Sequence, residues 1–193
     1  MKISAILLAA GMSRRMGEDK LLLPYKEKPL LQYAVDLLSD LPVYERIIVT
    51  TESRLDMITL MPCIQAEINK RPEAGQSESV RLGVSTASGD WYLFLLADQP
   101  LLGIIDLQPL LRIADNCNDK IIYPLINRNP GSPTMFSACF REQLLALSGD
   151  AGGRTVRVSH PEACVPFTPE RPGNFADIDS VEDFVKMNIE NRK

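Results

Sequence analysis

The sequence predicts a three-layer α/β fold built on a mainly parallel sheet. Short apolar runs bounded by glycine, proline or polar residues alternate with segments of helical spacing along most of the chain. Strands buried on both faces of a parallel sheet read as continuous apolar runs, as these do. Alternating strands and helices are typical of domains that bind ligands at the carboxyl ends of their strands. The 193 residues suit one domain, 1–193, with a substantial core.

The expected strands are short runs of apolar or β-branched residues. The first run stops at Gly11, and the strongest, WYLFLLA, ends just before Asp98. The strand pattern at 64–68 is weak. The segment 126–136 is expected to be a loop followed by a short strand. In chain order, strands are predicted at 3–10, 46–51, 64–68, 91–97, 120–123, the end of 126–136, and 163–167.

The expected helices have apolar residues three or four positions apart. Pro29 lies near the first turn of the first helix, where its fixed φ is favourable, and Pro42 ends that helix. Ser53 and Ser77 are placed as N-caps, because a serine hydroxyl accepts hydrogen bonds from free N–H groups of the first turn. In chain order, helices are predicted at 29–38, 53–60, 77–87, 104–116, 141–148 and 180–188.

The composition excludes several classes of protein. The net charge of −4 argues against general nucleic-acid binding. No apolar run reaches the roughly 20 residues that a membrane helix requires. The first apolar run is followed by a basic loop rather than by a small-residue cleavage site, so no signal peptide is expected. We therefore expect a cytoplasmic protein with no membrane partner.

The cysteines and the single histidine do not form a recognisable site. Cys63, Cys117, Cys139 and Cys164 are scattered, without a C-x-x-C pair, which argues against a zinc centre. We expect reduced, mostly buried thiols. His160 has no partner in an apparent triad, so a structural or surface role is expected. No serine or cysteine lies in a nucleophile elbow, and hydrolase chemistry has no support.

The loop after the first strand has the composition of a phosphate-binding loop. Ala9, Ala10 and Gly11 are small enough for a ligand to approach the backbone, and arginines and Lys20 follow. The spacing from Gly11 to Gly17 fits no Walker A loop, and there is no G-x-G-x-x-G pattern. From these residues alone, an ordinary turn beside a solvated basic patch is equally acceptable.

Three further stretches carry polar residues where chemistry is expected. Asp98 directly follows the strongest strand, where a carboxylate can hold Mg²⁺, although a turn aspartate that caps the next helix is the commoner case. The turn at 75–79 and the aspartates Asp177 and Asp179 are equally consistent with helix caps. Because parallel strands end at one edge of a sheet, Gly11, the turn at 75–79 and Asp98 are expected on the same rim.

These motifs together resemble one family. The stretch LAAGMSRRMGEDKLLLP is similar to LA(A/G)G-x-S-x-RMG-x-x-K-x-LL of the MobA-like nucleotidyltransferases, in the two-alanine version of the molybdenum cofactor cytidylyltransferases. LADQP resembles their metal motif, and DIDS their DIDTPEDL segment. GQSESVRLG, NPGSPTMF and GDAGGR match further family segments in the same order. The resemblance covers nearly the whole chain and implies a Rossmann-like nucleotidyltransferase fold.

The resemblance also implies a role for individual residues. It implies catalytic roles for Arg15, Lys20 and Asp98, and Mg²⁺ binding by Asp98 and by Asp179 rather than Asp177. Arg14 lies at a variable position of the family motif, so the resemblance implies no role for it. The residues implied in nucleotide binding are Leu8, Ala9, Ala10, Gly11, Arg15, Lys20, Gly75, Ser77 and Ser79. The residues implied in acceptor binding are Gly131, Pro133, Asp150, Gly152 and Arg154.

The implied reaction transfers CMP from CTP to the terminal phosphate of molybdopterin and releases pyrophosphate. A molybdenum hydroxylase apoenzyme is the implied partner. Guanylyl transfer, another phosphorylated acceptor and a non-catalytic cofactor-delivery module remain alternatives. The guanylyl branch carries a glycine in place of Ala10, which favours CTP. Ser132 replaces the usual histidine of its segment, and Gly153 replaces an alanine.

Overall fold

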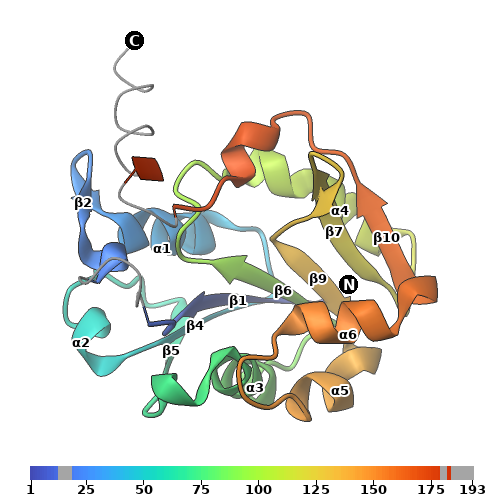
Figure 1. The fold of residues 1–193 in the computed structure, drawn as a ribbon, viewed down its shortest axis with the longest axis horizontal. Helices are drawn as coiled ribbons and strands as arrows, with labels where there is room; N and C mark the ends of the chain where they lie inside the picture. The colour runs from blue at the N-terminus through green and yellow to red at the C-terminus, as the bar shows by residue number, and fades with distance from the viewer. Residues whose placement is uncertain (13–18, 179–181, 184–193) are drawn as a thin grey trace.

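The computed structural model describes residues 1–12, 19–178 and 182–183. A central sheet lies between two helical layers, with α1 and α4 on one face and α3, α5 and α6 on the other (Figure 1). The helices are α1 (Leu30–Asp40), α2 (Glu52–Leu55), α3 (Gln76–Thr86), α4 (Ile104–Asp115), α5 (Arg141–Leu145) and α6 (Gly153–Ser159). The predicted three-layer α/β fold is confirmed.

The sheet has the strand order β10-β7-β9-β6-β1-β4-β5, and β8 pairs with β7. A separate hairpin is formed by β2 (Pro24–Tyr25) and β3 (Lys28–Pro29). The sheet strands are β1 (Ile3–Ala9), β4 (Glu45–Thr50), β5 (Ile64–Ile68), β6 (Trp91–Leu96), β7 (Ile121–Ile126), β8 (Asn129–Pro130), β9 (Thr134–Ser137) and β10 (Cys164–Phe167).

The centre of the sheet is β1, which pairs in parallel with β4 on one side and β6 on the other. Its side chains alternate between the two layers, so that Leu7 packs among α1 residues and Ile6 packs with Val80 and Val84 of α3. Both faces are covered, which explains why the strand reads as a continuous apolar run. The sheet is mainly parallel: the antiparallel pairs are those of β9 with β6 and β7 and of the two-residue β8 with β7.

Two predicted caps are wrong. α2 covers Glu52–Leu55, so Ser53 lies inside a short helix instead of opening one that reaches residue 60. The N-cap of α3 is Gly75, and Ser77 is buried within the first turn. In both cases the helix begins one residue before the serine, and at α3 the Ser77 N–H is bonded to the Gly149 carbonyl oxygen of another loop.

One helix was not expected, and one expected helix falls outside the described part. No helix was expected between residues 149 and 162, but α6 begins at Gly153 and includes Arg154. The helix expected at 180–188 lies outside the described residues except for Glu182 and Asp183. Among the described residues, no helix has the length and apolar character needed to cross a membrane.

The cysteine prediction is half correct. All four thiols are free, but none is buried: Cys63 and Cys139 are exposed, and Cys117 and Cys164 are partly exposed. Cys63 lies in a turn, Cys117 follows the end of α4, Cys139 lies in a short 3-10 helix, and Cys164 begins β10. His160 is structural, as predicted: its ring meets Phe140 edge-on, with 5.2 Å between centroids, and its Nδ1 lies 3.0 Å from the Val156 carbonyl oxygen.

Candidate functional site

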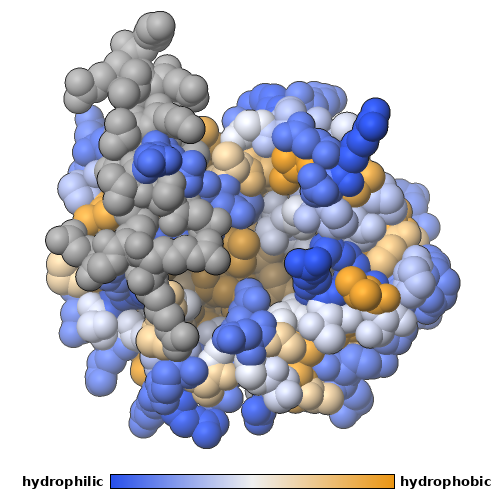
Figure 2. Space-filling model, in the orientation of Figure 1, coloured by the Kyte–Doolittle hydropathy of each residue, from blue (hydrophilic) through white to orange (hydrophobic). Residues whose placement is uncertain are grey.

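The carboxyl ends of β1, β4, β5 and β6 lie at one edge of the sheet, because these strands are parallel. Gly11, Asn69 and Asp98 follow the ends of β1, β5 and β6. The expectation that the first loop, the turn at 75–79 and Asp98 share one rim is therefore met by the topology. Figure 2 shows this face of the molecule hollowed near its centre, over β6 and β9 in the view of Figure 1.

Lys20 and Asp98 meet at this edge. Lys20 begins a short 3-10 helix, η1 (Lys20–Leu22), whose N-cap is Asp19. Its Nζ donates to Asp98 Oδ2 at 2.8 Å and to the carbonyl oxygen of Ile178 at 2.7 Å. Both side chains are mostly shielded from solvent, with 14% and 20% exposure. Residues separated by 78 positions thus form one charged pair, which the sequence alone does not reveal.

Asp98 fits a hard cation. Its Oδ1 is buried and has no hydrogen-bond partner among the described residues. A buried carboxylate oxygen without a donor is costly, and a bound cation would relieve that cost. Mg²⁺ is commonly held by one or two carboxylates together with phosphate and water oxygens. In the described part of the chain, no group of three or more His, Cys, Asp or Glu side chains is gathered into a metal cluster.

The segment after η5 (Pro172–Phe175) reaches the same edge. The Ile178 N–H donates to the Asp98 carbonyl oxygen at 3.0 Å, so this segment is bonded directly to the Asp98 turn. Asp177 is exposed. Asp179, the expected second metal ligand, lies outside the described residues, as does Arg15. The described segment thus reaches Asp98 through Ile178.

Arg54 was missed by the sequence analysis and organises the first loop. It is buried, with 4% exposure, and comes from α2. Its Nη1 donates to the Ala9 carbonyl oxygen at 2.6 Å, and its Nη2 donates to the Gly11 carbonyl oxygen at 2.8 Å. Its Nε and Nη2 also donate to the two carboxylate oxygens of Asp19, at 2.7 and 2.9 Å. One guanidinium thus joins both ends of the loop between β1 and η1.

The turn before α3 packs against a second loop. Gly75 has φ +96°, a conformation that L side chains rarely adopt, and a Cβ there would lie 2.3 Å from the Gly149 carbonyl oxygen. The Ser77 N–H donates to that same oxygen at 3.1 Å. Ser79 is buried, and its hydroxyl accepts from Asn69 Nδ2 at 3.0 Å. Ser79 therefore holds the end of β5 to α3 in this structure.

The residues expected to bind the acceptor fall into two groups. Gly131 and Pro133 lie beside β9, and the carbonyl oxygen of Ser132 accepts from Gln99 Nε2 at 3.2 Å. Gln99 Nε2 also donates to the Phe175 carbonyl oxygen at 2.9 Å, so Gln99 links the Asp98 turn to both neighbouring segments. The second group is found around the start of α6: Asp150 and the N-cap Gly152 precede the helix, and Arg154 lies in its first turn.

The glycine at position 153 has a physical reason. A Cβ at Gly153 would lie 2.9 Å from two ring atoms of Phe136, which belongs to β9 and is fully buried. The alanine that the family carries at this position would therefore displace a core ring. Gly153 and Phe136 are matched to each other, which the local sequence pattern does not disclose.

Comparisons with known proteins identify relatives of the chain. The chain matches the family model described as MobA-like NTP transferase domain over residues 5–164. A probable molybdenum cofactor guanylyltransferase of Bacillus mycoides is 26% identical over 65% of this chain and 63% of its own length. The molybdenum cofactor cytidylyltransferase of Escherichia coli is 26% identical over 95% of this chain and 94% of that protein. The purine catabolism protein PucB of Bacillus subtilis is 32% identical over 93% of this chain and 92% of its own length.

Solved structures share the fold at low identity. A nucleotidyl transferase from Methanothermobacter superposes with a TM-score of 0.80 at 23% identity, covering 98% of this chain and 97% of that chain. A complex of the Rv0371c protein of Mycobacterium tuberculosis with manganese gives a TM-score of 0.75 at 19% identity, covering 98% of this chain and 99% of that chain.

The chain spans less than two thirds of the length of two guanylyltransferases that it matches, 63% in the Bacillus mycoides protein and 61% in that of Trichormus variabilis.

We predict that Arg54 stabilises the protein through its bonds to the first loop. Arg54→Met should lower the free energy of unfolding by about 3–5 kcal/mol, because it leaves Asp19 and two carbonyl oxygens without their charged donor. Arg54→Lys should recover only part of this, since an ammonium group cannot reproduce the planar fork. Urea denaturation measures both. Arg112→Met, on the exposed side of α4, is the control and should change stability by less than about 0.5 kcal/mol; an equal loss in the control would contradict the assignment.

We also predict that Gly75 tolerates no side chain. Gly75→Ala should destabilise the protein by at least about 2 kcal/mol, from backbone strain together with the contact at Gly149. Gly173→Ala is the matched control, because a Cβ there meets no heavy atom within 4 Å. Thermal unfolding followed by circular dichroism measures both variants. If the two alanine variants melt together, Gly75 does not require its conformation.

Proposed function

Because the chain belongs to the family of MobA-like NTP transferases, we propose that it is a cytidylyltransferase that transfers CMP from CTP to the terminal phosphate of molybdopterin. Pyrophosphate is the other product. Two curated relatives bear the names molybdenum cofactor cytidylyltransferase and guanylyltransferase, and their names support the acceptor. The two alanines Ala9 and Ala10 in the first loop support CTP over GTP.

The observation that carries the proposal is the Lys20–Asp98 pair at the carboxyl edge of β6, next to the loop after β1. The reaction joins two groups that are both negatively charged, so the protein must neutralise charge where they meet. No covalent intermediate with the protein is required, because the acceptor phosphate can attack the α-phosphorus in line with the departing pyrophosphate. Positioning and electrostatic stabilisation then account for catalysis.

Each charged residue has a separate task in this reaction. Lys20 Nζ, held by the Ile178 carbonyl oxygen, donates to triphosphate oxygens and stabilises the leaving pyrophosphate. The backbone of Leu8 to Gly11 and Arg15 complete the triphosphate site. Asp98, with Asp179, would hold Mg²⁺, which supplies Lewis-acid neutralisation of phosphate oxygens when bound. The buried, unpartnered Oδ1 of Asp98 supports this assignment.

The remaining site residues divide between base and acceptor. Gly75 and the buried start of α3, with Ser77 and Ser79, form the wall beside the base; the Ser79 hydroxyl acts by fixing Asn69. Gly131, Pro133, Asp150, Gly152 and Arg154 face the acceptor side. A molybdenum hydroxylase apoenzyme would receive the product.

We expect Asp98→Asn to lower kcat at saturating Mg²⁺ by about 100-fold or more, because the amide cannot hold the cation that offsets charge at the reacting phosphates. Pyrophosphate release measures the rate, and thermal unfolding shows that the variant is folded. Asp115→Asn, on the exposed end of α4, is the control and should retain full activity. An Asp98→Asn enzyme with wild-type kcat would remove Asp98 from the metal site.

A panel of CTP, GTP, UTP and ATP, each with Mg²⁺ and molybdopterin, tests the reaction and the base. We expect pyrophosphate release with CTP at least about tenfold faster than with GTP, a ratio that corresponds to about 1.4 kcal/mol of transition-state discrimination. Faster turnover of GTP would instead support guanylyl transfer. Nucleotide binding without release from any of the four would support a non-catalytic delivery module.

A further inference from the structure

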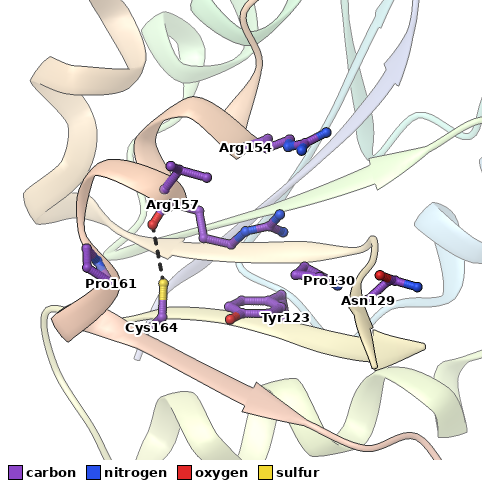
Figure 3. A pocket seen from close by; sticks show the side chains of 8 residues that line it. Tyr123, Asn129, Pro130, Arg154, Arg157, Pro161 and Cys164 are labelled. Carbon is purple, nitrogen blue, oxygen red and sulfur yellow. Dashed lines mark hydrogen bonds between the residues drawn. The ribbon is translucent and has the colours of Figure 1, made fainter. Parts of the chain in front are cut away.

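A cleft of about 480 Å³ lies between α6 and the strands β7 and β10. Its lining residues are Tyr123, Asn129, Pro130, Arg154, Arg157, Val158, Pro161 and Cys164. Figure 3 shows the guanidinium groups of Arg154 and Arg157 projecting in the same direction from α6, above the Tyr123 ring. They are three residues apart, which places them on one side of the helix.

The charge of this cleft is positive and uncompensated. Of the described residues that line it, Arg154 and Arg157 are the charged ones. Within the ranges that the structure describes, neither guanidinium pairs with a carboxylate. Burial raises the pKa of the Cys164 thiol and that of the Tyr123 phenol, so both remain neutral near pH 7. In a chain whose net charge is −4, two adjacent unpaired arginines in a cleft are unusual.

Arg157 is partly desolvated and held in place. Its guanidinium lies over the Tyr123 ring, 4.6 Å from the centroid, which fixes its direction through a cation–π contact. Burial lowers the pKa of Arg157, which reflects the cost of taking its charge out of water. A desolvated cation is stabilised by an oxyanion that accepts its fork of hydrogen bonds. The cleft is therefore preorganised for an anion.

An anion in this cleft would not be the reacting phosphate. β7 is separated from β6 by β9 alone, and two strand spacings amount to about 10 Å. The reacting phosphate must lie against Lys20 and Asp98, beyond the end of β6. A ligand that occupies both places needs a second oxygen-rich group about that far from its reacting phosphate.

We propose that the cleft between α6 and β7 is the distal acceptor subsite, in which Arg154 and Arg157 bind a second anionic group of the acceptor. This inference rests on the proposed transferase function, and it adds a requirement for the acceptor: one anionic group reacts and another anchors the molecule. Tyr123 positions Arg157, and the Asn129 amide borders the same space. The transferred group and the leaving group do not enter the cleft.

A titration with inorganic phosphate at constant ionic strength tests the subsite without turnover. The Nε–Hε signals of Arg154 and Arg157 in ¹H–¹⁵N spectra, assigned with Arg154→Lys and Arg157→Lys, should shift saturably. Arg112, on the other face of the sheet, should not respond. Arg157→Met should weaken this binding about 10- to 100-fold, the loss expected for charged hydrogen bonds. Absence of saturable shifts at Arg157 in folded protein would overturn the subsite.

Steady-state kinetics then decide whether the anion belongs to the acceptor. Arg157→Met and Arg157→Lys should raise KM for the acceptor at least about tenfold and leave KM for the nucleotide unchanged. Phosphate should inhibit competitively with the acceptor. Inhibition competitive with the nucleotide, or an unchanged KM for the acceptor, would overturn the proposal by assigning the anion to another ligand.

The two experiments separate the two proposals. If no nucleotide is turned over, the proposed transferase function fails, and the titration still decides whether the cleft holds an oxyanion. If turnover is normal and the titration is negative, the function stands and the distal subsite is excluded. Thermal unfolding of Arg157→Lys, which retains the charge, shows whether the fold survives the change.

Discussion

The buried guanidinium of Arg54 and the carbonyl oxygens of Ala9 and Gly11 satisfy each other. Ala9 is buried where β1 ends, and its carbonyl oxygen needs a donor there because buried backbone groups are costly when unpaired. Arg54 is equally costly to bury without acceptors. Its bonds to Asp19 add the far end of the loop, and Asp19 in turn caps the short helix that begins with Lys20. The position of Lys20 therefore depends on Arg54, a residue outside the predicted site.

A second set of bonds brings the end of the chain to the same edge. Asp106 of α4, which is buried, accepts from Asn174 Nδ2 at 3.0 Å and pairs with Arg171 at 2.7 Å. These contacts hold η5 against α4 and lead the chain to Ile178, which bonds both Lys20 and Asp98. The Lys20–Asp98 pair is thus held from three parts of the chain, which is the rigidity that catalysis by positioning requires.

Much of the fold follows from local pattern, and the site follows only in part. Apolar runs reveal the parallel strands, and the family motifs identify Lys20 and Asp98 as candidates without showing that they touch. The residues that arrange them escape such reasoning. Arg54 lies in a four-residue helix with no distinctive neighbours, and Arg157 lies in a helix that the sequence pattern did not predict. Their importance arises from contacts between segments far apart in the chain.

By itself, the sequence determined the α/β class, the two-sided burial of β1 and the presence of a small-residue loop followed by cations. Those properties depend on residue types and short spacings, which act within a few positions. Only the tertiary structure decided that Arg54 joins the ends of this loop, that Gly75 rather than Ser77 caps α3, and that Arg157 lines a cleft in which no carboxylate of the described residues pairs with it. Hydrogen-bond partners and desolvation are set by the packing of distant segments, and no local pattern records them.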